Sequence, residues 1–219
     1  MTPCVVVLVP MLGRPHTVAP LRDSLAATTD RARLLWLLTD GDADVIDAVG
    51  GDDRLMFPPR ARGDYPVKMN AGYRASSEPL LFLGACDIRF HPGWLEACEA
   101  KVAQGFGVVG TNDLGNKRTA TGKTSTHTLI TRDYADSFGT IDGPGLLHEG
   151  YWHEYVDDEL IETAKARGQY GHAPDAVVEH LHPLWGKAEP DAMYDQALRR
   201  MGFGAALWKK RRPLWTQGR

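Results

Sequence analysis

The sequence predicts an α/β fold built around a mostly parallel sheet. Residues 4–9 and 34–38 are apolar along their whole length and rich in valine or leucine, which is typical of strands buried on both faces. Stretches with helical spacing separate such runs over the first 110 residues, and this alternation indicates βαβ units. The 219 residues suit one domain with a small appendage, which we expect at 1–190 and 191–219.

The strands are expected where short apolar runs end at turn-forming or polar residues. Pro10 stops the first run, and Thr39-Asp40-Gly41 stops the second. Residues 124–131 alternate instead, as a half-exposed strand does. The expected strands are 4–9, 34–38, 54–57, 80–83, one starting at 108, 124–131 and 176–181.

The helices are expected between these strands. Pro92 suits a first helical turn, where its missing N–H costs nothing, and Gly168 marks a helix end. A long polar loop is expected at 110–123. The expected helices are 17–27, 44–49, 67–76, 92–103, 156–167 and one from 190 to about 207.

The charge of the chain is unevenly distributed. The net charge is −3, but residues 199–219 contain seven Lys and Arg and no Asp or Glu, which leaves 18 basic and 28 acidic side chains elsewhere. We call residues 199–219 the basic tail. It predicts contact with an anionic polymer or a membrane surface, although Gly202 and Gly204 weaken a continuous helix there; a solvated end that packs on the acidic body is the alternative.

Composition narrows the class of protein. No apolar run approaches the 18–20 residues or so that span a bilayer, and the first residues do not resemble a signal peptide. Three cysteines without a CxxC pattern favour a reducing compartment, so we expect a cytoplasmic protein.

Polar residues gather just after three of the expected strands, at 11–16, 40–44 and 85–89. Ligands of open α/β sheets bind outside the carboxyl ends of the strands, so these segments are the candidate binding loops. None contains the GxGxxG pattern of dinucleotide sites or the GxxxxGK[ST] pattern of P-loops, which disfavours both classes.

Four segments then carry a resemblance to a family. They are VVVLVPMLGRP, LLWLLTDGDAD, KMNAGYRASSEPLLFLGACDIRFHPGWLEA, and YVDDELIETAKARG followed by VVEHLHP. In this order they resemble the GT-A nucleotide-sugar glycosyltransferases, in particular the family 2-like group, and GTNDLGN and HLHP resemble its phage and actinobacterial members. The resemblance implies a GT-A-like α/β/α sandwich, and host cytoplasm as the location of a phage-encoded chain.

The same resemblance implies an activity. It is the transfer of a sugar from a UDP- or GDP-type donor to an acceptor hydroxyl, with inversion and with Mn²⁺ or Mg²⁺. Asp157 takes the place of the catalytic base and Asp158 is the near alternative; both also suit a helix N-terminus on electrostatic grounds alone. The donor would contact residues of the first three segments, namely Pro10, Arg14, Asp40, Lys68, Asn70 and Arg89.

The metal motif departs from that of the group, which usually shows D-x-D. Here Asp87 is the only carboxylate, because Ala85 and Arg89 stand at the flanking positions. A hard cation needs only one or two carboxylates when phosphates and water complete its shell, and Mn²⁺ accepts imidazole. We therefore expect His182, or else His180, to complete the site, with a direct pairing of Arg89 and the diphosphate as the alternative.

Two other functions remain open at this point. The incomplete metal motif is compatible with a nucleotide-sugar-binding module of weak activity, and the need for nucleotide and metal is compatible with a nucleotidyltransferase. A single glycine in Met11–Arg14 counts against the second, which would need a glycine-rich triphosphate loop. The acceptor is a protein, a glycan or a modified DNA base, and the glycines of residues 143–155 suggest a lid.

Overall fold

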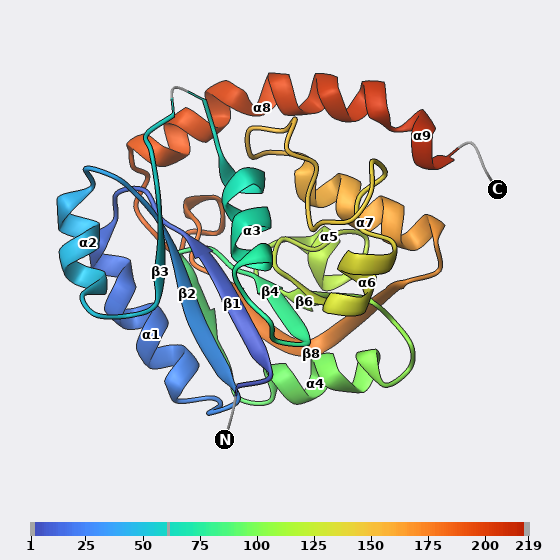
Figure 1. The fold of residues 1–219 in the computed structure, drawn as a ribbon, viewed down its shortest axis with the longest axis horizontal. Helices are drawn as coiled ribbons and strands as arrows, with labels where there is room; N and C mark the ends of the chain where they lie inside the picture. Colours follow the sequence, from blue (N-terminus) through green and yellow to red (C-terminus); the bar gives the residue numbers. More distant parts are fainter. Residues whose placement is uncertain (1–2, 61, 217–219) are drawn as a thin grey trace.

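A computed structural model describes residues 3–60 and 62–216, within which eight strands form one curled, mixed sheet (Figure 1). Their order is β3-β2-β1-β4-β7-β6-β8-β5. The strands are β1 (Val5–Pro10), β2 (Ala32–Thr39), β3 (Arg54–Phe57), β4 (Leu80–Leu83), β5 (Ile88–Phe90), β6 (Val108–Asn112), β7 (Thr128–Thr131) and β8 (Tyr170–His180). The α/β fold around a mostly parallel sheet that the sequence predicts is thus confirmed.

Helices cover both faces of the sheet. They are α1 (Val18–Ala26), α2 (Ala43–Val49), α3 (Tyr65–Arg74), α4 (Trp94–Val102), α5 (Lys117–Ala120), α6 (Arg132–Ser137), α7 (Val156–Ala166), α8 (Ala192–Arg211) and α9 (Pro213–Thr216), with 3-10 turns at Pro15–Thr17 and Pro183–Trp185. One buried cluster joins the sheet to α1, α2 and α4, and a second joins it to α3, α6 and α7. The sheet therefore lies between two apolar layers.

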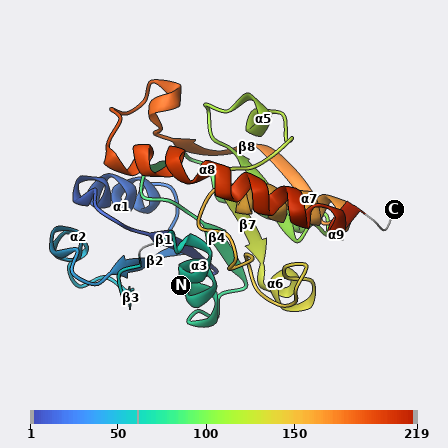
Figure 2. The ribbon, with the colours of Figure 1, turned by 90° about the horizontal axis from the view of Figure 1, so that it is seen from above.

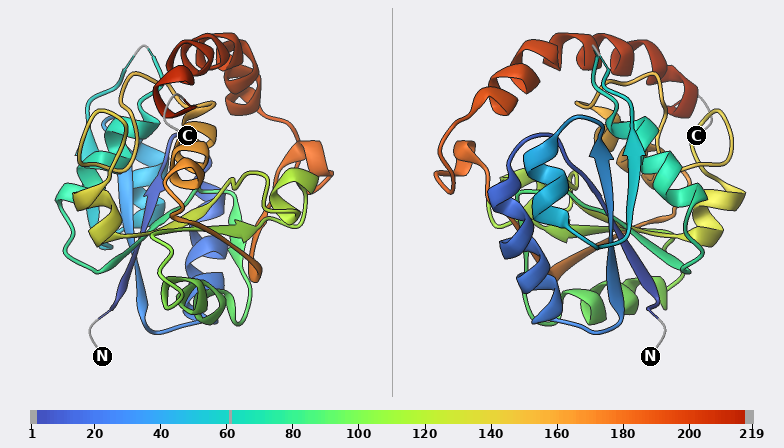
Figure 3. Two further views of the ribbon diagram at one scale, coloured as in Figure 1. Left: turned by 90° about the vertical axis from the view of Figure 1, so that its right-hand side faces the viewer. Right: turned by 60° about the vertical axis from the view of Figure 1, so that its left-hand side comes forward.

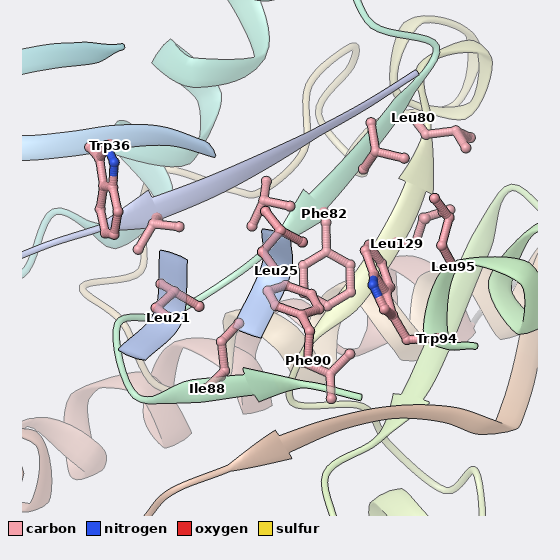
Figure 4. Close-up of a cluster of buried hydrophobic side chains, with 14 of the residues drawn as sticks. Leu21, Leu25, Trp36, Leu80, Phe82, Ile88, Phe90, Trp94, Leu95 and Leu129 are labelled. Carbon is pink, nitrogen blue, oxygen red and sulfur yellow. The ribbon is translucent and has the colours of Figure 1, made fainter. Parts of the chain in front are cut away.

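Strand β1 supplies both layers. Every residue from Val5 to Val9 is 0% exposed, with Val5, Val7 and Val9 in the first cluster and Val6 and Leu8 in the second. Phe82, Phe90 and Trp94 pack as tilted rings with centroids 4.7–5.4 Å apart in the first layer, where Figure 4 shows them together. This alternation explains why the run is apolar at every position.

The directions of the strands bring their carboxyl ends to one edge. Strands β1 to β4 pair in parallel, β7 is antiparallel to both β4 and β6, and β8 is parallel to β6. The loops that follow β1, β2, β4, β6 and β8 consequently meet at a single edge of the sheet, which we call the strand-end edge.

Three short elements were absent from the sequence prediction. Ile88–Phe90 forms β5, whose two apolar residues flank the exposed Arg89 and whose pairing with β8 is a long-range contact. One turn of helix, α5, interrupts the polar loop expected at 110–123, and Asn116 caps it by accepting the N–H of Arg118. A cap on one turn leaves no periodic pattern in the sequence, which is why α5 could not be foreseen. Helix α6 follows β7 directly and was also not expected.

The C-terminal segment is a long helix that crosses the strand-end edge. Figure 2 shows α8 from above, running the length of the molecule, and Figure 3 shows it arching over the ends of the strands. Its cation Arg211 is buried and binds Glu159 of α7, with nitrogen–oxygen distances of 2.8–3.2 Å, and Asp142 at 2.7 Å. Trp215 of α9 donates its indole N–H to Glu162 at 3.2 Å. The basic tail is therefore packed on α7 within the described residues.

Gly202 and Gly204 of the tail do not interrupt α8, contrary to the weakening that the sequence suggests. At Gly204 the helix lies against the carbonyl of Glu154, and a β-carbon there would overlap with that carbonyl group. Gly202 faces open space. None of the helices in the described part of the chain has the length and apolar character that a bilayer crossing requires.

The two glycines give a matched pair of substitutions. Gly204→Ala is expected to lower the free energy of unfolding by about 1–3 kcal/mol, because the new methyl group forces α8 away from Glu154. Gly202→Ala is expected to raise it by about 0.5–1 kcal/mol, because it only removes backbone freedom from an exposed helix position. Urea unfolding followed by circular dichroism measures both, and equal effects would contradict the close packing of α8.

Candidate functional site

The loop after β1 is strained and tied to the loop after β2. Gly13 and Arg14 both have positive φ, at 61° and 63°. The N–H of Gly13 donates to Asp42 Oδ2 at 2.6 Å, across the gap between the two loops. A left-handed backbone conformation is unfavourable for arginine and persists only where the surrounding contacts hold it. The backbone of this loop therefore fixes the direction in which the Arg14 side chain leaves it.

Asp87 lies just beyond β4 and is enclosed by polar partners. Its Oδ2 accepts from Arg14 Nη1 at 3.1 Å and from the Tyr194 hydroxyl at 2.8 Å, and its Oδ1 lies 3.5 Å from His180 Nε2. Burial acts to raise the pKa of this carboxyl, yet hydrogen bonds from His180 and Tyr194 and the charge of Arg14 hold the pKa well below its usual range. Asp87 is thus a fixed anion at the strand-end edge.

Three histidines surround this anion. His180, at the end of β8, lies between His127 and His182, with ring centroids 4.9 Å away on each side. Burial and the neighbouring His180 lower the pKa of His127 to about 3, so His127 is neutral at physiological pH. His182 Nδ1 accepts the N–H of Leu184 at 3.1 Å, so the neutral His182 ring carries its proton on Nε2.

The structure brings together Asp87, His180 and His182, the three predicted metal ligands. His180, rather than the favoured His182, is the one that faces the carboxylate. Within residues 3–60 and 62–216, no three His, Cys, Asp or Glu side chains already have the arrangement of a metal cage. A cation at Asp87 and His180 would therefore need ligand oxygens from a substrate, which agrees with the few protein ligands that Mg²⁺ sites use.

The second half of the site is the start of α7. Tyr155, the residue before α7, has a φ of 69° and begins the helix with Asp157 in its first turn. Partial burial and the charge of Asp158 raise the pKa of Asp157 to about 7, against the opposing pull of the helix N–H groups. Asp158 has partners of its own, because it accepts from Thr124 at 3.1 Å and pairs with Arg118 at 3.5 Å. Two adjacent carboxyls are thereby given different environments.

Lys68 and Asn70, which the sequence predicts to contact the sugar donor, are buried side chains of α3 that join separate segments of the chain. Lys68 donates to Thr39 Oγ1 at 2.7 Å and to the Met11 carbonyl at 3.3 Å, which joins the ends of β1 and β2. Asn70 accepts the N–H groups of Leu146 and Leu147 at 2.9 and 3.1 Å. Both side chains make buried hydrogen bonds next to the strand-end edge, and these bonds occupy their polar groups.

The other predicted donor contacts differ in accessibility. Asp40 is exposed directly after β2, and Pro10 is partly buried at the end of β1. Arg89 is 54% exposed on the outside of β5 and lies 3.9 Å from Glu179, so the structure does not bring it to Asp87. Arg14 is the cation that contacts Asp87 instead.

Aromatic residues pack the loop before α7. Trp152 stacks on Phe203 of α8 with centroids 4.2 Å apart, and His153 stacks on Tyr65 at 4.7 Å. The Tyr151 hydroxyl donates to the buried Glu159 at 2.8 Å. Together with the bonds from Asn70, these contacts hold residues 143–155 against the body in this structure.

Several residues of the site were not foreseen from the sequence. Asp42 lies within the expected binding loop 40–44, but its role as a tie to Gly13 depends on the fold. Asp191 and Tyr194 reach Arg14 and Asp87 from the far end of the chain. The only sequence signal at Asp191 is a Pro-Asp pair before a helical stretch, which marks a helix start and says nothing about a ligand.

The fold is similar to those of several solved structures, whose proteins are glycosyltransferases. The chain resembles the mannosyltransferase PcManGT from Pyrobaculum calidifontis in complex with GDP-Man and Mn²⁺ (TM-score 0.63, 14% identity, 91% of this chain and 61% of that one). It also resembles S. aureus TarS 1-349 in complex with UDP-GlcNAc (TM-score 0.61, 11% identity, 87% and 62%).

A third similar structure is glucosyl-3-phosphoglycerate synthase from Mycobacterium tuberculosis in complex with Mn²⁺, UDP and glucosyl-3-phosphoglycerate. The TM-score is 0.63 at 15% identity over 94% of this chain and 79% of that one. The chain spans about three fifths of the first two structures. No protein-family model and no curated protein matches the sequence. These likenesses confirm a GT-A-like fold.

The two acids of α7 can be told apart by their effects on stability. The raised pKa of Asp157 means that the folded chain keeps a proton which the unfolded chain loses between about pH 4 and 7, so ionised Asp157 lowers stability above pH 7. Asp157→Asn is expected to raise the melting temperature at pH 8 and to change it little at pH 4.5.

Asp158→Asn serves as the control. It keeps an oxygen that can accept from Thr124, removes the charge that pairs with the exposed Arg118, and relieves the repulsion of ionised Asp157, so it is expected to raise the melting temperature at pH 8 by less than Asp157→Asn does. Calorimetric scans of the three chains at both pH values provide the comparison. An Asp157→Asn chain that melts below the wild type at pH 8 would refute the raised pKa.

Proposed function

We propose that the chain is an inverting GT-A-type glycosyltransferase that transfers a sugar from a UDP- or GDP-type donor to an acceptor hydroxyl. The observation that carries the proposal is Asp157, a carboxyl with a pKa of about 7 in the first turn of α7. A carboxyl with a pKa near 7 can accept a proton from a hydroxyl near neutral pH. The GT-A-like fold and the ion pair of Arg14 and Asp87 at the strand-end edge also support the proposal.

Asp157 acts as the general base in this proposal. The acceptor oxygen forms a bond to the anomeric carbon while the bond from that carbon to the diphosphate oxygen breaks. The hydroxyl proton passes to Asp157, and the nucleoside diphosphate leaves with the electron pair. Asp158 is held beside Asp157 by Arg118 and Thr124, and its charge contributes to the raised pKa of Asp157.

The donor would bind along the ends of β1, β2 and β4. Arg14 offers a guanidinium to the diphosphate, and the exposed Asp40 and nearby Pro10 border the space for the nucleoside. Support for a UDP- or GDP-type donor comes from the structures of similar fold, which hold GDP-Man, UDP-GlcNAc or UDP.

Asp87 and His180 are the residues proposed to hold Mn²⁺ or Mg²⁺. They face each other at 3.5 Å, and a cation bound between them would replace the proton that His180 now directs at Asp87, whereas His182 lies beside His180 and not at the carboxylate. The bound cation would neutralise charge on the leaving diphosphate. Similar structures with Mn²⁺ or Mg²⁺ support the choice of metal.

The two histidines make a test of the metal site. His180→Ala is expected to weaken Mn²⁺ binding in the presence of UDP or GDP at least tenfold, and His182→Ala to weaken it much less, because only His180 faces Asp87. Electron paramagnetic resonance of free Mn²⁺ measures both. A larger loss in His182→Ala would reverse the assignment.

The acceptor and the cellular location stay predictions. Arg211 and Arg212 of the basic tail pair with acids of the body, whereas Arg199, Lys209 and Lys210 are exposed on α8. We propose that these exposed cations face an anionic acceptor or surface. A protein, a glycan and modified DNA remain candidates for the acceptor, and the cytoplasm, or the host cytoplasm for a phage-encoded chain, remains the expected compartment.

The activity can be tested with a panel of nucleotide sugars and Mn²⁺. We expect donor turnover by the wild type and a loss of about 100-fold or more in Asp157→Asn, because that variant cannot accept the proton. The acid limb of the kcat/KM profile is expected near pH 7, since Asp157 must be ionised. Calorimetric binding of a nucleotide sugar without turnover would favour a binding module, and undiminished activity of Asp157→Asn would remove the base.

A further inference from the structure

The N-terminus of α8 lies on the donor half of the site. Asp191 caps α8 by accepting the N–H groups of Met193 and Tyr194 at 2.9 and 3.2 Å. The same carboxylate binds Arg14 through two nitrogens, with Nε at 2.6 Å and Nη2 at 2.8 Å. One side chain therefore fixes the start of α8 and the direction of a guanidinium that is 177 residues away in sequence.

Tyr194 contacts both charged groups of the donor half. Its hydroxyl donates to Asp87 Oδ2 at 2.8 Å, and the guanidinium carbon of Arg14 lies 4.0 Å from the centre of its ring. The ring thus makes a cation–π contact with Arg14, while the hydroxyl donates a hydrogen bond to Asp87. Both contacts join Tyr194, which lies beyond residue 190, to residues of the strand-end loops.

The contacts of Arg14 do not use all the N–H groups of its guanidinium. A guanidinium carries five N–H groups; Asp191 and Asp87 together accept three of them, and Cys86 Sγ lies 3.9 Å from Nη1 as a further, weak acceptor. The backbone strain at Arg14 and the 11% exposure of its side chain leave it little freedom to turn. Arg14 accordingly presents its remaining N–H groups from a fixed position.

The C-terminal half of α8 is also bound to the body of the protein. Arg211 is buried in the carboxylates of Glu159 and Asp142, and Gly204 allows close contact with Glu154. The helix is therefore held at both ends, on the donor half by Asp191 and Tyr194 and on α7 by Arg211 (Figure 3).

We infer that Asp191 and Tyr194 are positioning residues of the donor site, which align Arg14 and Asp87 for a nucleoside diphosphate. The inference rests on the proposed function. It gives the start of the C-terminal helix a part in donor binding that is separate from any contact of its outer face with an acceptor. If α8 instead competed with the donor for Asp87, substitution of Asp191 or Tyr194 would tighten nucleotide binding.

Calorimetric titration of the full chain with UDP and with GDP, in the presence of Mn²⁺, tests the inference. Asp191→Asn and Tyr194→Phe are each expected to weaken binding of the preferred nucleotide about five- to tenfold. Tyr194→Phe keeps the ring against Arg14 and removes only the hydroxyl bond to Asp87. Asp195→Asn, an exposed acid one turn further along α8, is the matched control and is expected to bind as the wild type does.

Kinetics with the donor found active separate positioning from general loss of structure. Both variants are expected to raise the KM for the donor, while the KM for the acceptor and the acid limb near pH 7 stay unchanged, because Asp157 is on α7. Unchanged or tighter nucleotide binding in Asp191→Asn and Tyr194→Phe would overturn the inference alone. A wild-type chain that binds neither nucleotide would overturn the proposed function, and this inference with it.

Discussion

The complete burial of β1 is the constraint on which the rest of the structure depends. Its residues from Val5 to Val9 are 0% exposed and face two apolar layers in turn, so no polar side chain could be placed there without losing its contacts to water. Chemistry is consequently confined to the ends of the strands, and the parallel order of β1, β2 and β4 gathers those ends at one edge. Arg14 and Asp87 meet there because each follows a strand of this central group.

Helix α8 turns this edge into an enclosed site. Its two terminal ion pairs, Asp191 with Arg14 and Arg211 with Glu159, join segments that are 177 and 52 residues apart in sequence. Of the two, only the pair of Arg211 and Glu159 is buried on both sides, and breaking such a pair by removing one partner typically costs about 3–5 kcal/mol, because the other charge is left without compensation. Such pairs add little net stability but define geometry, and here they relate the donor half of the site to the helix that carries Asp157.

The two acids at the start of α7 illustrate how environment separates identical side chains. Asp158 pairs with Arg118 and accepts a hydrogen bond from Thr124, whereas partial burial and the charge of Asp158 raise the pKa of Asp157 to about 7. Divergent environments of this kind identify acid–base roles in enzymes. The same principle distinguishes His180, which faces Asp87, from His182, whose Nδ1 is occupied by a backbone N–H.

The α/β class, the buried strands and the segments in which polar residues follow them could all be predicted from the sequence, because periodicity and strand-end position are local properties. The sequence also predicted that Asp87 follows a strand and that Asp157 stands at a helix start, as the structure has them, and their functional roles stay predictions. Only the tertiary structure decided that Arg14 rather than Arg89 contacts Asp87, that Lys68 and Asn70 are buried braces, and that α8 reaches the site. These outcomes depend on pairings between distant segments, such as β5 with β8 and α8 with the strand-end edge, and such pairings leave no local pattern in the chain.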